Sequence, residues 1–424
     1  MMLTETLLKE EIVSYRLLNG LKVYLYHKPD FRKTYVSLKV KFGSIDKNFT
    51  VDGKEYNLPE GIAHFLEHKL FETKRGDAAT LLAQLGASPN AYTSNTMTNY
   101  IYSATQNIPE ALRVLLDFVF SPYFTEESVV KERGIIAQEI KMYADLPEHI
   151  LFARLLTNMY HGHSCRDDIG GTFESLEEIN VETLKLCHSN FYRPDNISIM
   201  VTGNFPLRRV KKVIQKQQLN FPKAKNNVVR KYFDEPATVK INKDTIQENV
   251  SIPKVGIGVK LKPTGKNIQE SLKREILIRM LFTLYLDDSS PVYHDLLSKG
   301  IINDSFDMTF NFAPTFAYGI INTDSIKPER TAKKLQKIIL DIRNFEVTET
   351  AFLRLKKSLI GQTIRMLDSV EAVTDRFLRY ENSGYSFFDR CKILEEITLK
   401  DLELVKKAVR KKCISTLIII PNKA

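Results

Sequence analysis

The pattern of hydrophobic and polar residues predicts strands and helices in a similar order in each half of the chain. Runs typical of strands occur at 22–26 and 34–42, and a similar run occurs at 254–261. Segments with helical periodicity follow, and a β hairpin is predicted near 90–104 and again near 305–323. Further helices precede a last strand in each half. We therefore expect an α+β fold of two sandwich-like domains, each a mostly antiparallel sheet with helices packed to one side.

Internal repeats indicate that the two halves are homologous. Residues 176–186 reappear at 394–404 with six of eleven positions identical, and 125–142 matches 348–366 more loosely. Two matches in the same order favour duplication of one unit over chance. The length of 424 residues also exceeds what one hydrophobic core usually holds. We expect a first domain over 1–225 and a homologous second domain over 226–424, joined by a linker near 222–236.

A group of metal-ligating residues lies on one predicted helix of the first half. His64, Glu67 and His68 are spaced i, i+3 and i+4, which places them on one helical face. Pro59 is expected in the first turn, and the apolar residues between 62 and 70 have helical periodicity. Two neutral imidazoles are good zinc ligands, and a glutamate one turn away is placed to act as a general base on water.

A catalytic zinc needs a third protein ligand, and Glu139 is the candidate. We expect a helix that begins after Thr125, with Glu132 and Glu139 two turns apart on one face. One carboxylate can bind the metal while the other orders the site electrostatically. The alternative is a surface helix whose two histidines extend into water.

These residues resemble the metal-binding segments of the pitrilysin and insulinase family of inverted zinc peptidases, and within it the short bacterial branch. The resemblance is strong in the first half and loose in the second, and it also covers 86–93, 169–172 and 190–196. It implies one zinc per chain, bound by His64, His68 and Glu139. Glu67 would be the catalytic base, and Glu132 would support the metal ligands.

The resemblance also implies a clamshell chamber in which peptides or unfolded segments are hydrolysed. An edge strand near 90–96 would bind the substrate by adding it to the sheet. The substrate-binding residues expected on that strand are Asn90, Ala91, Tyr92 and Thr93.

The second half lacks the metal set. The positions that match the three motif residues and the two glutamates carry Phe282, Tyr285, Leu286, Lys356 and Thr363. We therefore expect a single zinc site in each chain.

A departure from the family pattern points to a partner subunit. Family members carry an arginine and a tyrosine in a C-terminal half that reach the substrate, and Leu297 and Asn303 occupy those positions here. Neither side chain supplies a forked cation or a phenol. We expect a heterodimer with a homologous zinc-less subunit that supplies the pair; the alternative is a shifted alignment with Tyr318 as the tyrosine.

Charge and composition argue against a nucleic-acid-binding protein and a membrane protein. The formal charge is +10, but the basic residues are spread among helical patterns and match no nucleic-acid motif, so we expect no nucleic-acid partner. We expect no transmembrane segment, no targeting peptide, four reduced cysteines and a cytoplasmic protein. A non-catalytic scaffold subunit of a larger assembly is the competing interpretation. The physiological substrate, a bacteriocin-like peptide or peptides in general, stays open.

Overall fold

The first half of the chain forms a six-stranded sheet with strand order β1-β2-β10-β3-β9-β8. The computed structural model describes residues 12–221, 226–265, 267–383, 385 and 387–422. The strands of this sheet are β1 (Val13–Arg16), β2 (Lys22–His27), β3 (Thr34–Val40), β8 (Ala87–Thr93), β9 (Thr98–Ala104) and β10 (Ile197–Gly203). β2 and β10 run parallel, and every other neighbouring pair is antiparallel.

The second half repeats this topology in a five-stranded sheet with order β12-β16-β13-β15-β14. Its strands are β12 (Lys243–Glu248), β13 (Lys254–Lys260), β14 (Asp307–Phe312), β15 (Ala317–Asp324) and β16 (Ile414–Pro421). β12 and β16 run parallel and the other pairs antiparallel, so β12, β16, β13, β15 and β14 correspond to β2, β10, β3, β9 and β8. The duplication and the mostly antiparallel sheets predicted from the sequence are confirmed.

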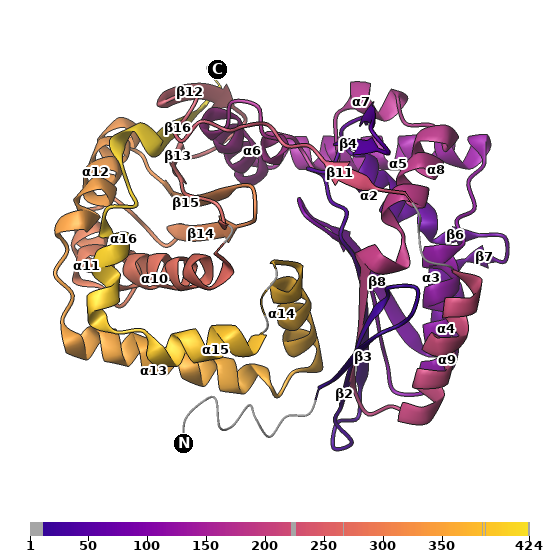
Figure 1. Cartoon of the computed structure of the whole chain (residues 1–424). Helices are drawn as coiled ribbons and strands as arrows, with labels where there is room; N and C mark the ends of the chain where they lie inside the picture. Colours follow the sequence, from indigo (N-terminus) through magenta and orange to yellow (C-terminus); the bar gives the residue numbers. More distant parts are fainter. Residues whose placement is uncertain (1–11, 222–225, 266, 384, 386, 423–424) are drawn as a thin grey trace.

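Helices of each half cover one face of its own sheet (Figure 1). The first half contributes α2 (Ile62–Leu70), α3 (Ala78–Gln84), α4 (Ile108–Phe120), α5 (Glu126–Ala144), α7 (Phe173–Glu177), α8 (Val181–Phe191) and α9 (Leu207–Asn220). The second half contributes α10 (Ile268–Leu286), α11 (Pro291–Ser298), α12 (Pro328–Asp341), α13 (Glu349–Met366), α15 (Phe387–Glu396) and α16 (Glu403–Lys406). Their apolar faces and the sheets form the main cores.

Short elements complete the chain. They are β4 (Asn48–Val51), β5 (Lys54–Asn57), β6 (Glu72–Thr73), β7 (Gly76–Asp77), β11 (Val228–Arg230) and the 3-10 turns Ser164–Arg166, Pro194–Asn196, Ile342–Asn344, Leu399–Leu402 and Lys411–Cys413. Within the described ranges, no helix is long and apolar enough to cross a bilayer.

Each half also sends one helix onto the sheet of the other half, which the sequence did not predict. α6 (Pro147–Met159) packs on β13 and β16, and α14 (Val370–Ser383) packs on β3 and β10 (Figure 1). α6 follows α5 and α14 follows α13, and these are the helices that carry the second sequence repeat. The exchange is therefore reciprocal, and the sheet faces turned away from the main helix layers are partly covered by the opposite half.

Two glycines on β13 permit the close approach of α6. A Cβ at Gly256 would lie 2.8 Å from Leu155 Cδ1, and one at Gly258 would lie 2.8 Å from Met159 Sδ. Side chains alternate between the faces of a strand, so both glycines lie on the face that α6 covers. A larger residue there would force the side chains of Leu151, Leu155 and Met159 to move.

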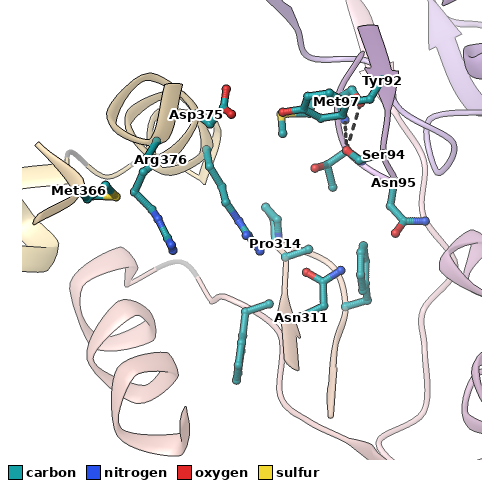
Figure 2. A pocket seen from close by; sticks show the side chains of 15 residues that line it. Tyr92, Ser94, Asn95, Met97, Asn311, Pro314, Met366, Asp375 and Arg376 are labelled. Atoms are coloured by element: carbon teal, nitrogen blue, oxygen red, sulfur yellow. Dashed lines mark hydrogen bonds between the residues drawn. The ribbon is translucent and has the colours of Figure 1, made fainter. Parts of the chain in front are cut away.

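A cavity of about 460 Å³ lies where the halves face each other. It is lined by the end of β8 and the turn after it, by the β14–β15 hairpin, and by α13 and α14 (Figure 2). This arrangement agrees with the predicted clamshell.

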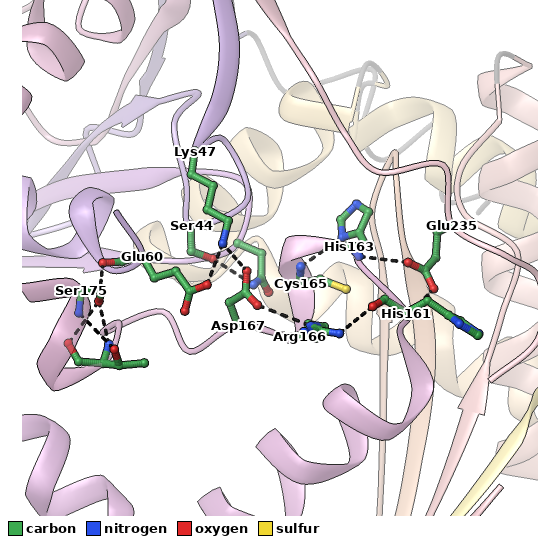
Figure 3. A network of polar contacts seen from close by, with 12 residues as sticks. Ser44, Lys47, Glu60, His161, His163, Cys165, Arg166, Asp167, Ser175 and Glu235 are labelled. Carbon is green, nitrogen blue, oxygen red and sulfur yellow. Dashed lines mark hydrogen bonds and ion pairs between the residues drawn. The ribbon is translucent and has the colours of Figure 1, made fainter. Parts of the chain in front are cut away.

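The predicted linker is anchored to both halves by Glu235. Its carboxylate accepts hydrogen bonds from the backbone N–H groups of His161, Gly162 and His163 at 2.7–3.1 Å, and from Lys260 Nζ on β13 at 2.6 Å. Figure 3 shows Glu235 beside His161 and His163. Residues 222–225 of this linker lie outside the described residues, and the division at 225/226 stays a prediction. His163 Nδ1 accepts from the backbone of Cys165, which fits the interpretation of this segment as a loop.

Candidate metal centre

α2 places the three motif residues at the edge of the first sheet. Its apolar residues, among them Phe65 and Leu66, are buried in the first core, and the helix contacts β8 and α5. His64 and His68 lie on the face turned to α5. The helix begins at Ile62, so the expectation that Pro59 occupies its first turn was wrong.

Glycines allow a loop to pack against the start of α2. Gly61, the residue before the helix, has φ +82°, and a Cβ there would lie 2.4 Å from the carbonyl oxygen of Gly170. Gly171 has φ +84°, and its Cβ would lie 2.7 Å from the carbonyl oxygen of Glu60. Lys47 Nζ holds the same junction through Glu60 at 2.7 Å and Asp167 at 2.8 Å (Figure 3). The close contact and the positive φ angles explain why glycines stand at 61 and 171.

α5 brings the two predicted glutamates to α2. The helix begins after Thr125, whose side chain accepts from the backbone N–H of Ser128, as the sequence predicted. Glu132 Oε1 lies 3.0 Å from His68 Nδ1. Glu139 Oε2 lies 3.7 Å from the Nε2 atoms of both His64 and His68.

The three predicted metal ligands therefore converge on one point. One ligand atom from each of His64, His68 and Glu139 lies within 4.8 Å of the others, and no further such group occurs in the described part of the chain. A tetrahedral zinc with bonds near 2.1 Å separates its ligand atoms by about 3.4 Å. The two distances of 3.7 Å are close to that value and too long for hydrogen bonds.

The environment shifts the pKa values of the two imidazoles in opposite directions. Burial lowers the pKa of His64 to about 4, and the neighbouring His68 adds to this effect. Burial also lowers the pKa of His68, but the hydrogen bond and charge of Glu132 outweigh it, so this pKa lies above its ordinary value. The contact with Glu132 holds the proton at Nδ1 and turns Nε2 toward Glu139.

Glu67 lies beside the ligands and is held by the edge strand. Thr93 Oγ1, at the end of β8, donates a 2.6 Å hydrogen bond to Glu67 Oε2. Burial raises the pKa of the Glu67 carboxyl, although Thr93 and His68 act in the opposite direction. A carboxylate with raised proton affinity beside a metal site is suited to accept and return a proton.

A cleft of about 780 Å³ opens over this group. Its walls include Ala91, Tyr92 and Thr93, three of the four residues predicted to bind substrate. The fourth, Asn90, is exposed on the same strand. β8 is the last strand of its sheet, so its outer edge has no partner strand among the described residues. The strand ends at Thr93 rather than near 96, because a turn at Ser94–Met97 follows.

The cleft contains a pair that sequence reasoning missed. His149 was treated as an isolated histidine, but its Nε2 lies 2.7 Å from Asp168 Oδ2, and both residues line the cleft. His64 Nδ1 is buried and has no hydrogen-bond partner among the described residues. Asp168 directly precedes the segment 169–172, which resembles the family, and this position was the only sign in the sequence that it lies near the site.

The second half has hydrophobic core where the first half has the metal group. Phe282, Tyr285 and Leu286 are buried on α10. Lys356 Nζ donates to the carbonyl oxygens of Glu395 and Ile397 at 2.6 and 2.8 Å. Thr363 Oγ1 bonds its own helix.

The expected arginine and tyrosine positions also lie away from the site. Leu297 and Asn303 line neither the cleft nor the cavity between the halves, and Asn303 bonds Ser305 in a turn. Tyr318 is buried and its hydroxyl accepts from Asn311 at 3.3 Å. It lines neither the cleft nor the cavity between the halves.

Comparisons with known proteins place the chain in a family. Residues 22–172 match the family model described as Insulinase (Peptidase family M16), and 178–359 match the model of the peptidase M16 inactive domain. The uncharacterized zinc protease YmfH of Bacillus subtilis (strain 168) is 37% identical over 401 residues, 94% of each chain.

Solved structures share this fold over nearly all of the chain. A crystal structure of an M16-like peptidase from Alicyclobacillus acidocaldarius has a TM-score of 0.92 and 31% identity, and covers 97% of this chain and 99% of that one. A protease from Helicobacter pylori has a TM-score of 0.86 at 20% identity, with 97% and 100% coverage.

Proposed function

Because the chain belongs to the insulinase family of peptidases (M16), we propose that it is a zinc-dependent endopeptidase subunit that hydrolyses peptides or unfolded segments. The observation that carries the proposal is the convergence of His64, His68 and Glu139 beside Glu67, at the open edge of a sheet. The same edge strand that bonds Glu67 is free to pair with an extended peptide.

The residues present fit a zinc ion. Two imidazole nitrogens and one carboxylate oxygen form the donor set of a catalytic zinc site, and the cleft leaves room for water or substrate. Glu132 bonds the other nitrogen of His68, as carboxylates commonly do behind zinc-ligating histidines. We therefore assign His64, His68 and Glu139 as the ligands of one zinc per chain.

When bound, zinc polarises the substrate carbonyl and makes a nearby water easier to deprotonate. Glu67 takes the proton from the attacking water and gives it to the nitrogen of the leaving amine, so the carboxyl returns to its starting state. Thr93 fixes the Oε2 side of Glu67 and leaves Oε1 for the water. β8 aligns the substrate main chain, with Asn90, Ala91, Tyr92 and Thr93 as the contacting residues.

We further propose that the active species is a heterodimer. Leu297 and Asn303 occupy the positions from which family members supply an arginine and a tyrosine, and neither lines the cleft. A homologous subunit without zinc would supply that pair. Full turnover by the purified chain alone would contradict the heterodimer and leave the peptidase proposal intact.

We also propose that the protein is cytoplasmic. The four cysteines are free and buried, which suits the reducing cytoplasm.

Glu67→Gln tests the function. The variant should retain zinc and lose most turnover of a peptide library, on the order of 10² to 10⁴-fold, because the proton acceptor is gone. Glu178→Gln, which neutralises an exposed carboxylate on the same half, should keep wild-type rates. A zinc-replete Glu67→Gln protein with wild-type turnover would contradict the proposal, as would a zinc-replete wild-type heterodimer without any cleavage, which would favour the scaffold interpretation.

A further inference from the structure

The cavity between the halves adjoins the catalytic cleft. Tyr92 lines both, and beyond it the cavity is walled by the turn after β8, by the tip of the β14–β15 hairpin and by α14. Figure 2 shows Asn311 and Pro314 of the hairpin region opposite Tyr92 and Ser94 of the first half, with α14 closing a third side. A peptide bound along β8 would therefore pass directly from the cleft to this cavity.

Tyr92 lies on the same face of the sheet as α14, which packs on β3 and β10. Tyr92 is directly opposite Asn99 of β9, and Asn99 is opposite Lys39 of β3. Residues opposite each other in an antiparallel pair share a face, and Lys39 bonds α14 through the carbonyl oxygen of Leu378. Thr93 points to the other face, toward Glu67. Side chains of a peptide paired with β8 would alternate in the same way between α14 and the metal centre.

α14 presents two arginines to this cavity. Arg376 and Arg379 are both exposed, both line the cavity, and lie three residues apart on one side of the helix. The acidic group of the same wall, Asp375, is turned to the sheet, where Tyr35 OH donates to it at 3.2 Å. Arg376 Nη1 also lies 3.5 Å from Tyr380 OH on its own helix, which steadies the side chain without neutralising it.

We propose that this cavity is a substrate subsite for a carboxylate, in which Arg376 and Arg379 bind the acidic group of a peptide residue whose side chain lies on the Tyr92 face of β8. The inference rests on the proposed peptidase function and gives it a specificity. Guanidinium groups bind carboxylates through paired charge-assisted hydrogen bonds, and both arginines line the cavity beside the Tyr92 face.

The carboxylate has two possible sources: the side chain of Asp or Glu, or the C-terminus of a short peptide. Both present the same group to the arginines. C-terminal amidation separates them, because it removes the second source and leaves the first unchanged.

The test is a series of quenched fluorescent peptides in which Glu replaces Gln at one position at a time, cleaved by the zinc-loaded protein in its active assembly. At one position, and not at its immediate neighbours, Glu should raise kcat/KM over Gln by about tenfold, mainly through KM. The double variant Arg376→Glu/Arg379→Glu should abolish that ratio and favour Lys at the same position. A new preference for Lys cannot arise from misfolding.

Arg330→Glu is the matched control, since Arg330 is exposed on α12 and lies outside the cavity. It should retain the Glu-over-Gln ratio. The proposal is overturned if the double variant keeps the wild-type ratio, if Arg330→Glu loses it equally, or if Glu is favoured at successive positions. Fluorescence anisotropy of the same labelled peptides bound to the Glu67→Gln protein measures the preference for Glu over Gln without any turnover. It therefore shows whether the subsite fails or the peptidase proposal fails.

Discussion

Replacing Glu381 should destabilise the chain, because a buried lysine between the halves then loses its counter-charge. Glu381 on α14 pairs with Lys39 of β3 and Lys22 of β2, and accepts from Ser198 Oγ at 3.1 Å. The Lys39 side chain is fully buried, whereas Lys22 is 26% exposed and can turn to water. In Glu381→Gln, Lys39 loses its counter-charge and keeps only neutral acceptors, the carbonyl oxygen of Leu378 at 2.7 Å and the amide oxygen of the new side chain.

Glu381→Gln should lower the free energy of unfolding by about 3 kcal/mol. The surrounding lysines lower the pKa of Glu381 from 4.5 to about 2 against the effect of burial, and a shift of that size corresponds to about 3 kcal/mol. Loss of one partner of a buried ion pair costs a similar amount. Burial, however, lowers the pKa of Lys39 to about 8 despite its partner. The lost hydration of the lysine therefore offsets most of the gain, and the intact pair contributes little in total.

A variant that removes both charges of the pair is therefore the decisive one. Lys39→Met/Glu381→Gln removes both charges and should recover to within about 1 kcal/mol of wild type. Urea unfolding followed by far-UV circular dichroism measures the change, since the chain has no tryptophan. Glu329→Gln, which breaks an exposed pair with Lys243, should change stability by less than about 0.5 kcal/mol. A double variant as unstable as Glu381→Gln would refute the reasoning.

Three further predictions follow from the same contacts. Glu132→Gln should weaken zinc binding by about 10- to 100-fold in competition with a chelator, because it removes the carboxylate behind His68, and unchanged affinity would contradict that role. In urea unfolding, Gly256→Ala should lower the free energy of unfolding by about 1–3 kcal/mol, because its Cβ would collide with side chains of α6. Gly361→Ala, which has open space on α13, should raise that free energy by about 0.5–1 kcal/mol, and equal effects of the two variants would contradict the packing. The free energy of unfolding should fall as the pH drops from 4.5 toward 2, since the pKa of Glu381 is depressed in the folded state and its contribution is present above 4.5; a flat stability profile over this range would contradict it.

Local patterns predicted the sheets and the metal group because each depends on short-range periodicity. The i, i+3, i+4 spacing of His64, Glu67 and His68 defines one helical face wherever the helix lies. Periodicity also placed Glu132 and Glu139 two turns apart on one face of a helix capped by Thr125, whereas the family resemblance pointed to Glu139 as the metal ligand. The repeated segments predicted the shared topology because homologous sequences form the same strands.

The exchange of α6 and α14 could not be predicted in this way. The spacing of Leu151, Leu155 and Met159 defines an apolar face, but such a face fits either sheet. The available signal was the pair of glycines at 256 and 258, which lie two apart in a strand and so on one face. The contact between His149 and Asp168 was missed for a related reason, since it joins a helix to a loop and has no sequence period.

The most direct test of the metal centre is an anomalous difference map collected at the zinc edge from crystals of the zinc-loaded chain. The account predicts one peak per chain, in contact with His64 Nε2, His68 Nε2 and a Glu139 carboxylate oxygen. A peak elsewhere, or none at this position in protein shown to contain zinc, would contradict it.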